Sequence, residues 1–326
     1  MNILFDINHP ADVHQFRYVI DKLTKKHDVK VIARDKDCVY SLLRYFNIPF
    51  IKRNGYDGLL GKIFGMIFID LKLIKISLRF KPDVLVGSSG NVYVAQAGKF
   101  LGIPSVVFED TEHSKLQNKL CFPFATKIVT PESFKLDLGK KQVRYPGSKE
   151  LCYLSSDYFV PDKKIKKKLG KGKIIFLRFV SWKASHDIGK KGISNKKKLV
   201  KRLSKLGKVV ISSEEKLPEA LEKYELKDCK NKIHDCLYYS DIVISEGATI
   251  AAEAAVLKRP VIYANELSMG YTDELIKKEM MAQVTDDERI IELAKNLILE
   301  KNKPKKLKTE FDLNEFMAKE ILKCAK

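Results

Sequence analysis

The sequence predicts an α/β protein that consists of two domains in series, each with a parallel sheet between layers of helices. From residue 2 to residue 130, short apolar runs alternate with amphipathic stretches, which is the pattern of strands and helices in a parallel sheet. The pattern stops at 145–172, where prolines, a glycine and a lysine run are typical of a connector. It restarts at residue 173. We therefore expect a first domain at 1–150, a connector at 151–172 and a second domain at 173–326, whose last helix is able to pack back on the first domain.

Length and composition agree with this division. The chain has 326 residues, which suits two domains of ordinary size, and 45% of them are apolar, enough for two buried cores. The six cysteines form no CxxC pair and no Cys/His spacing typical of a metal site, so we expect reduced thiols and a cytoplasmic protein. The first residues, MNILFDI, predict a strand because no basic segment precedes the apolar run, as it would in a signal peptide.

The formal charge of +20 comes largely from lysine-rich runs at 163–173, 190–205 and 301–308. Proteins that bind nucleic acids place aromatic side chains among such charges, and these runs have few. A solvated surface is therefore the favoured interpretation, and we expect no nucleic-acid partner. An anionic membrane surface or a phosphorylated substrate is the next alternative.

The first domain is expected to alternate regularly between strands and helices. The predicted strands are 2–7, 28–33, 49–52, 83–87, 104–108 and 127–130, and the predicted helices are 13–26, 39–46, 59–80, 92–101 and 115–120. Asp12 is expected to cap the first helix, with Gln15 at the capping-box position. The triplet Asp35-Lys36-Asp37 is interpreted as a helix cap, in preference to a metal site, because the neighbouring basic side chains reduce its negative charge.

The most apolar long segment is 59–80. Its charged residues argue against a simple membrane span. Lys72, Lys75 and Arg79 recur at i, i+3 and i+7, which places them on one face of a helix. Two interpretations stay open: a core helix with its basic residues in solvent, or an interfacial helix that docks on anionic lipid at the inner face of the cell membrane.

Ligands of open parallel sheets bind at the carboxyl ends of the strands, so polar residues there are candidates for function. His9 and His14 lie at the first strand–helix joint. Glu109, Asp110 and Glu112 follow the strand at 104–108, together with His113. Clustered carboxyl groups raise and lower one another's pKa values, which allows acid–base chemistry at this position.

In the second domain the predicted strands are 173–177, 209–212, 241–245 and 260–264, and the predicted helices are 196–206, 217–224, 234–240 and 250–257. A polar loop at 178–192 holds Trp182, His186 and Asp187. The run 238–264 forms one strand–turn–helix–strand unit with short connections.

The turn at 246–249 leaves backbone N–H groups free at the start of a helix, which predicts an anion site suited to a phosphate. Gly247 permits close approach of a ligand, and Thr249 adds a hydroxyl donor. Glu253 follows one helical turn later on the same face, where its carboxylate is able to accept both hydroxyls of a ribose. The alternative is an ordinary strand–helix joint with a solvated glutamate.

These motifs resemble the GT-B superfamily, in which two Rossmann-like domains face each other across a cleft and bind a nucleotide-sugar between them. The run 238–264 resembles the nucleotide signature of MurG-type glycosyltransferases and of UDP-N-acetylglucosamine 2-epimerases. The acidic cluster at 109–112 and the pair Gln117-Asn118 are similar to a region of the 2-epimerases. The whole-chain pattern is closer still to domain-of-unknown-function family 354, with matching stretches at 6–10, 34–37, 82–83, 117–118, 147–154, 178, 184–187 and 247–255.

The resemblance implies roles for individual residues. The turn Gly247-Ala248-Thr249, together with Ser245 two residues before it, would hold the diphosphate, and Glu253 would hold the ribose. Ile233 and His234 would present backbone groups to the base, and Arg178, directly after the first strand of the second domain, would donate to the diphosphate. Two departures weaken the transfer of an exact reaction: Ala248 replaces a glycine of the epimerase turn, and Asn8-His9-Pro10 replaces the glycine-rich loop of the MurG type.

The sequence therefore favours a metal-independent glycosyltransferase that uses a UDP-sugar in cell-surface polysaccharide or glycolipid synthesis, with a lipid-linked or polysaccharide acceptor. His9, His14 or a carboxylate of 109–112 would act as the base, and no cofactor or metal is expected. The second interpretation is a UDP-N-acetylglucosamine 2-epimerase, with Glu109, Asp110, Glu112 and His186 as acids and bases. The third is a non-catalytic protein that binds nucleotides or nucleic acid.

Overall fold

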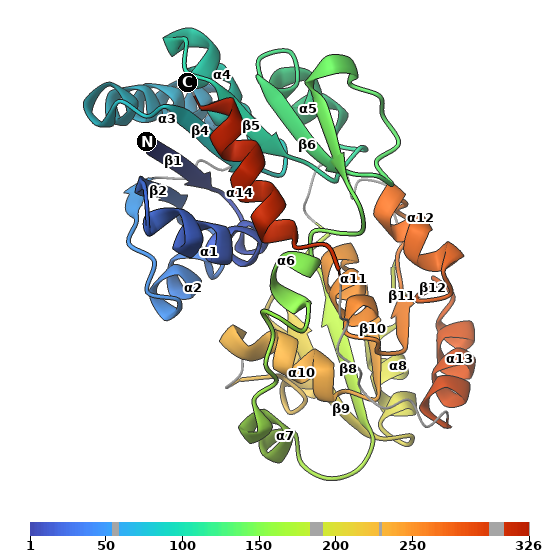
Figure 1. Cartoon of the computed structure of the whole chain (residues 1–326). Helices are drawn as coiled ribbons and strands as arrows, with labels where there is room; N and C mark the ends of the chain where they lie inside the picture. The colour runs from blue at the N-terminus through green and yellow to red at the C-terminus, as the bar shows by residue number, and fades with distance from the viewer. Residues whose placement is uncertain (54–58, 183–191, 228–229, 300–309, 326) are drawn as a thin grey trace. The chain divides into compact units, whose positions relative to one another are not determined.

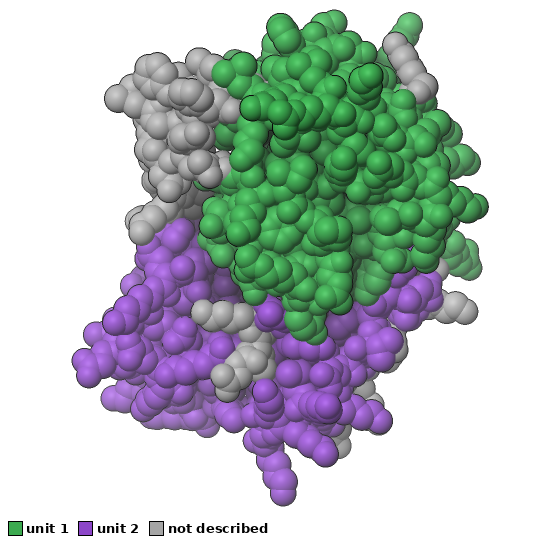
Figure 2. Space-filling view, turned by 90° about the vertical axis from the view of Figure 1, so that its left-hand side faces the viewer, with its two compact units in different colours: residues 1–153, 310–326 green, residues 154–309 purple. Residues whose placement is uncertain are grey.

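The computed structural model describes residues 1–53, 59–182, 192–227, 230–299 and 310–325. For residues 59–68 and 70, in the helix at 59–80, it describes the backbone only. The chain forms two compact units. Unit 1 contains residues 1–153 and 310–326, and unit 2 contains residues 154–309 (Figure 2). Each unit has one parallel sheet with helices on both of its faces (Figure 1).

Unit 1 has a seven-stranded sheet of order β3-β2-β1-β4-β5-β6-β7. Its strands are β1 Asn2–Ile7, β2 Asp28–Arg34, β3 Ile51–Arg53, β4 Val84–Ser88, β5 Ser105–Phe108, β6 Lys127–Pro131 and β7 Gln142–Tyr145. All neighbours are parallel, and the register pairs Ile7 with Ala33 and Asp6 with Gly87, so the carboxyl ends of the central strands lie together. The edge strand β7 was not expected, because its four residues are only half apolar.

The helices of unit 1 are α1 Pro10–Thr24, α2 Val39–Tyr45, α3 Leu59–Phe80, α4 Val92–Leu101, α5 Lys115–Cys121, α6 Leu151–Leu154 and α14 Leu313–Cys324. α6 lies where the two units join along the chain. α1, α2 and α14 cover one face of the sheet, and α3, α4 and α5 cover the other (Figure 1). The core beneath α3–α5 includes Leu4, Leu73, Leu85, Val94 and Val107.

Unit 2 has a five-stranded parallel sheet of order β12-β11-β10-β8-β9. Its strands are β8 Ile174–Phe179, β9 Lys208–Ser213, β10 Ile242–Ser245, β11 Val261–Tyr263 and β12 Ala282–Gln283. Its helices are α7 Lys163–Leu169, α8 Lys196–Leu203, α9 Glu219–Glu222, α10 Ile233–Tyr239, α11 Ala248–Val256, α12 Gly270–Lys277 and α13 Asp287–Leu299. The core between this sheet and α8 and α13 includes Leu177, Leu199, Ile244 and Ile291.

The structure differs from the expected boundaries at two places. Residues 154–172, expected as part of a connector, belong to unit 2 and contain α7, whose Ile165 and Leu169 are buried. Residues 310–326, expected at the end of the second domain with a last helix able to pack back on the first, belong to unit 1. There Asn314 Nδ2 donates to the Cys152 carbonyl at 2.7 Å, and Lys127 Nζ pairs with Glu320 at 3.0 Å. These contacts join parts of the chain that are far apart in sequence.

Two expected helix caps are wrong. α1 begins at Pro10 with His9 as its N-cap, and Asp12 is the third helical residue. Proline is favoured at the first helical position, which moves the start ahead of Asp12. The triplet Asp35-Lys36-Asp37 does not cap α2, whose N-cap residue is Cys38 without a side-chain hydrogen bond. Among the described residues, no helix is both long enough and apolar enough to span a bilayer.

Candidate functional site

The start of α1 is fixed by a reciprocal capping box. The His9 imidazole Nδ1 accepts from the Ala11 N–H at 3.3 Å, while the Asp12 carboxylate accepts from the N–H groups of Asn8 and His9, both at 3.0 Å. Ser89, after β4, donates to the other oxygen of Asp12 at 3.1 Å. His9 is exposed and Asp12 is fully buried, so at this joint the histidine is presented by the strand end and the aspartate holds it there.

A buried ion pair lies at the same edge of the sheet, near the end of β1. Asp6 at the end of β1 accepts from Arg53 through both carboxylate oxygens, at 2.9 and 3.2 Å. Asn91, the N-cap of α4, donates to Asp6 at 2.9 Å. Both charged side chains are less than 4% exposed. A hydrogen-bonded pair of this kind fixes β1, β3 and β4 in one arrangement and is too enclosed to contact a substrate.

The acidic run after β5 forms the centre of the unit 1 site. Glu109 accepts from the backbone N–H groups of Asp110 and Thr111 at 2.8 and 2.7 Å. Asp110 forms an ion pair with Lys149 Nζ at 2.7 Å, and both side chains are less than 10% exposed. Gly90 has a φ of +60°, and an added Cβ would lie 2.7 Å from Glu109 Oε2. The backbone there therefore needs glycine both for its left-handed conformation and for the space that the carboxyl group takes.

Lys149 and Glu150 were not among the expected site residues. They follow β7 in a tight turn, and Glu150 is fully buried, with neither carboxylate oxygen in a hydrogen bond of normal geometry. The segment 147–154 was noted only as part of a resemblance, because its position beside the acidic run depends on the unexpected strand β7. Together Asp12, Glu109, Asp110, Lys149 and Glu150 form a group that we call the unit 1 ionisable cluster.

Burial and neighbouring charges shift the pKa values of these groups. Burial, and then the neighbouring Asp110, raises the pKa of Glu109 to about 8. Burial also raises the pKa of Glu150 to about 7, although Lys149 opposes the shift. Asp110 and Glu150 outweigh the opposing effect of burial and raise the pKa of Lys149. The cluster therefore holds a lysine cation paired with Asp110 beside Glu109, a carboxyl group that keeps its proton at neutral pH.

These shifts predict that the protein loses stability as the pH rises. Glu109 and Glu150 bind protons more tightly in the folded than in the unfolded chain. The stability that their protonation contributes is fully present below pH 4.5 and is lost progressively as the pH rises to about 8. We expect Glu150→Gln to flatten this fall, because glutamine carries no charge at any pH, with a gain of about 1.4 kcal/mol above pH 8 for each unit of raised pKa. Urea unfolding at pH 5, 7 and 9 measures it. The exposed Glu132→Gln is the control, and identical pH dependence in the parent and Glu150→Gln contradicts the assignment.

The other expected catalytic residues of unit 1 lie apart from this cluster or at its margin. His14 is buried in α1 and packs against the rings of Phe46 and Tyr153, at centroid distances of 5.8 and 5.4 Å. Glu112 is half-buried and accepts from the Lys135 N–H at 3.0 Å. His186, which belongs to unit 2, lies outside the described residues. His14 thus occupies an aromatic core position, where it is enclosed instead of facing the strand ends.

In unit 2, the turn that was expected to bind an anion begins a helix without a side-chain cap. α11 begins at Ala248, two residues earlier than expected, and its N-cap residue Gly247 offers no side chain to the first-turn N–H groups. The fully buried Ser245 fixes the turn: its hydroxyl accepts from the Gly247 N–H at 3.0 Å and donates to the Gly247 carbonyl at 2.7 Å. The positive end of the helix dipole is therefore left without an acidic or hydroxyl cap.

Behind this turn, Glu253 is 3% exposed and pairs with His234 of α10, with Nε2 and Oε1 3.0 Å apart. The alternative of a solvated glutamate is wrong. Ile233 is the first residue of α10, so its backbone and that of His234 lie at a helix start. The imidazole holds the Glu253 carboxylate in position in the first turns of α11.

Arg178 is the second-to-last residue of β8, whereas the sequence placed it directly after the strand. Its guanidinium donates to Ser212 Oγ and Glu214 Oε1, both at 2.8 Å, from the neighbouring strand end. The register pairs Arg178 with Ser245 on one side and Ser212 on the other, so the arginine and the α11 turn share one edge of the sheet.

A family comparison covers the whole chain: the model described as "Protein of unknown function (DUF354)" matches residues 1–326. The chain belongs to the DUF354 family. This confirms the resemblance expected from motifs that are spread over nearly the whole chain. No curated protein matches the sequence.

Solved structures with the same fold include two UDP-GlcNAc 2-epimerases. The enzyme of Neisseria meningitidis bound to UDP-GlcNAc has a TM-score of 0.73 at 15% identity, over 99% of this chain and 100% of that chain. The Methanocaldococcus jannaschii enzyme in complex with UDP-GlcNAc and UDP has a TM-score of 0.71 at 13% identity, with the same coverage. The spinosyn rhamnosyltransferase SpnG, complexed with spinosyn aglycone, has a TM-score of 0.61 at 11% identity, over 99% and 97% of the two chains. This DUF354 chain has the GT-B fold.

Glu246 is a residue of this DUF354 chain whose importance the sequence did not indicate. It is fully buried and accepts from the N–H groups of Val180 and Ile193 at 3.0 and 3.1 Å, and Lys196 Nζ lies 3.3 Å from it. Burial raises its pKa, and Lys196 opposes this. Glu246 thus ties the chain after β8 to the chain before α8, beside the α11 turn.

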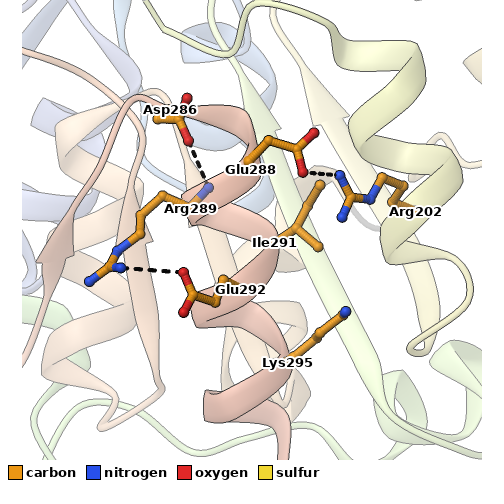
Figure 3. A pocket seen from close by; sticks show the side chains of 7 residues that line it. All are labelled: Arg202, Asp286, Glu288, Arg289, Ile291, Glu292 and Lys295. Atoms are coloured by element: carbon orange, nitrogen blue, oxygen red, sulfur yellow. Dashed lines mark hydrogen bonds and ion pairs between the residues drawn. The ribbon is translucent and has the colours of Figure 1, made fainter.

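A hollow of about 380 Å³ lies elsewhere in unit 2, along the outer side of α13 (Figure 3). Its lining combines Arg202, Arg289 and Lys295 with Asp286, Glu288 and Glu292. Arg202 pairs with Glu288, and Arg289 with Glu292 at 3.3 Å (Figure 3). Positive and negative charges are equal in number, so this hollow is a network of surface ion pairs and offers a ligand no net charge. Within the described ranges, no three His, Cys, Asp or Glu side chains are grouped to hold a metal ion.

Proposed function

We propose that this protein is a glycosyltransferase that binds a UDP-sugar on unit 2 and needs no metal ion. The observation that carries the proposal is the start of α11, where uncapped N–H groups point from a helix N-terminus and the buried Glu253 follows one turn later. A diphosphate fits the first feature, and the two hydroxyls of a ribose fit the second. Two structures with this fold, the 2-epimerases of Neisseria meningitidis and Methanocaldococcus jannaschii, are bound to UDP-GlcNAc.

Transfer of the sugar requires stabilisation of the UDP leaving group. The helix dipole of α11 supplies fixed partial positive charge without reorganisation, which is effective where negative charge develops. Arg178 adds a full charge at the same strand edge, on a guanidinium that Ser212 and Glu214 already hold in place. Its planar fork suits two oxygens of a diphosphate.

Activation of the acceptor requires a base, and unit 1 offers two kinds of group at its strand ends. His9 is exposed, but its Nδ1 already accepts the capping N–H, so in the neutral ring Nε2 carries the proton and donates. Asp110, paired with Lys149, is the carboxylate assigned to accept the proton of the acceptor hydroxyl. The acceptor class that we propose is a hydroxyl of a glycolipid or a cell-surface polysaccharide.

A second candidate, a UDP-GlcNAc 2-epimerase, is favoured by one specific observation. Glu109 keeps its proton near neutral pH while Asp110, its neighbour, is paired with a cation. An epimerase needs both a proton donor and a proton acceptor at the sugar, whereas an inverting transferase needs one base.

Incubation with UDP-GlcNAc and no acceptor distinguishes the two candidates. A transferase leaves the substrate unchanged until an acceptor is supplied, and then releases UDP in proportion to it. An epimerase forms the manno-isomer or free UDP from the substrate alone. A thermal-shift comparison of UDP-, GDP- and TDP-sugars, done first, identifies the nucleotide. Failure of all three to raise the melting temperature contradicts both candidates.

Arg178→Lys should lower turnover by about tenfold or more, because lysine keeps the charge but loses the planar pair of donors. The matched control is Lys197→Ala, which removes an exposed charge from α8 in the same unit. Initial rates at saturating UDP-sugar measure the difference. Equal rates in the two variants would show that Arg178 only links β8 to β9.

A further inference from the structure

The outward side of α3 and α4 in unit 1 has an unusual composition. Three large apolar side chains are exposed there: Leu71 by 55%, Leu78 by 62% and Phe100 by 78%. Leu71 and Leu78 are seven residues apart and so lie on one face of α3, while Ile69, Leu73 and Phe80 of the same helix are buried against the sheet. α3 and α4 pack side by side on one face of the sheet (Figure 1).

The other exposed residues whose side chains are described in these two helices are all basic. Among the side chains described for α3 and α4, the exposed set consists of Leu71, Leu78, Phe100, Lys72, Lys75, Arg79 and Lys99. We call this set the α3–α4 surface. It contains no exposed acidic residue and no uncharged polar residue. Lys72 donates to the Lys52 carbonyl at 2.9 Å and keeps two further N–H donors.

The opposite face of the same sheet shows what an ordinary surface of this protein looks like. The exposed residues of α1 are Asp21, Lys22 and Thr24, and those of α14 are Glu315, Lys319 and Lys323. On α1 and α14 both signs of charge are present and no large apolar side chain is exposed, while α2 on the same face exposes Tyr45 by 43%. The composition of the α3–α4 surface is therefore a property of that face and not of the chain as a whole.

We propose that the α3–α4 surface docks on an anionic lipid membrane. Basic side chains beside exposed leucine and phenylalanine on helices that lie along a surface are the features of interfacial binding: the cations meet lipid headgroups while the apolar side chains enter the acyl boundary. A polyanion such as RNA attracts the cations and gives the three apolar side chains no apolar environment. Three exposed apolar side chains and four basic ones therefore fit a lipid surface better than a nucleic acid. This inference is independent of the reaction that the protein catalyses.

Unit 2 provides a matched control. α7 carries Lys163, Lys164, Lys166, Lys167 and Lys168 on its exposed side, and its apolar residues Ile165 and Leu169 are buried. It has as much positive charge as the α3–α4 surface and no exposed apolar residue. A general attraction between a protein of charge +20 and an anionic surface would depend equally on α7 and on the α3–α4 surface.

Co-sedimentation with vesicles tests the proposal. The parent protein should pellet with phosphatidylcholine vesicles that contain phosphatidylglycerol, at low salt, and not with phosphatidylcholine alone. Each basic residue near such a surface contributes roughly fivefold in partitioning, so Lys72→Glu/Lys75→Glu/Arg79→Glu should lower binding more than tenfold. Leu71→Ser/Leu78→Ser/Phe100→Ser, which leaves the charge unchanged, should also lower it about tenfold. Lys163→Glu/Lys164→Glu/Lys167→Glu should keep binding within about twofold of the parent.

Three results would overturn the proposal: no binding of the parent to the anionic vesicles, an equal loss in the α7 control, or full binding by the serine variant. If the serine variant keeps full binding to the vesicles and binds polyuridylic acid with the affinity of the parent, the surface serves a polyanion and not a membrane. Melting temperatures of all variants, measured without vesicles, show that each is folded. UDP binding in each variant, measured in the same buffer, keeps this result separate from the proposed activity.

Discussion

Lys149→Met is expected to destabilise the protein by about 3–5 kcal/mol, the usual cost of removing one partner from a buried ion pair. The ammonium group lies 2.7 Å from Asp110 and is less than 10% exposed, so its loss leaves a carboxylate buried without a counter-charge. Urea unfolding at pH 7 measures the loss of stability. Turnover should fall in the same variant because Asp110, the proposed base, loses the ammonium group that holds it in place.

The double variant Lys149→Met/Asp110→Asn distinguishes the ion pair from simple packing. Removing both charges should recover part of the stability that the single variant loses, because no uncompensated charge remains. The control is Lys140→Met, an exposed lysine of unit 1, which should change stability by less than about 0.5 kcal/mol. Additive losses in the double variant would mean that the Lys149–Asp110 contact contributes no coupling.

Glu253→Gln is expected to weaken UDP binding by about 1–3 kcal/mol, or roughly 5- to 150-fold. Glutamine has nearly the same volume, so α11 and its contact with His234 should stay in place. It carries no charge, and its amide is able to accept only one of the two ribose hydroxyls. Isothermal titration calorimetry with UDP measures the change. Glu292→Gln, an exposed carboxylate of α13 in the same unit, should bind UDP like the parent, and equal affinity in the two variants would remove Glu253 from the site.

The sequence predicted most of the fold because its elements are regular in period. Buried strands such as β1 and β10 are short apolar runs, and α3 begins and ends where its pattern does. The boundaries that differ depend on interactions across the chain. β7 is a half-polar edge strand, and the position of α14 is fixed by contacts with residues such as Cys152 that are far away in sequence.

The candidate site was predictable where it depends on local sequence. The turn before α11 and the carboxyl groups after β5 follow directly from strand–helix joints, and both lie where the sequence places them. Lys149 was not predictable, because its partner Asp110 is brought to it by the sheet order and not by spacing. His14 shows the converse: its sequence position suggested a catalytic role, and the packing of Phe46 and Tyr153 places it in an aromatic core.

We propose that UDP binds at the start of α11 through backbone groups, without metal. Amide hydrogen exchange of residues 247–250, followed by mass spectrometry in EDTA with and without saturating UDP, tests it most directly. UDP should slow exchange in this segment and around Glu253, and added magnesium should change neither effect. Unchanged exchange at 247–250 under conditions where calorimetry shows UDP bound would contradict it.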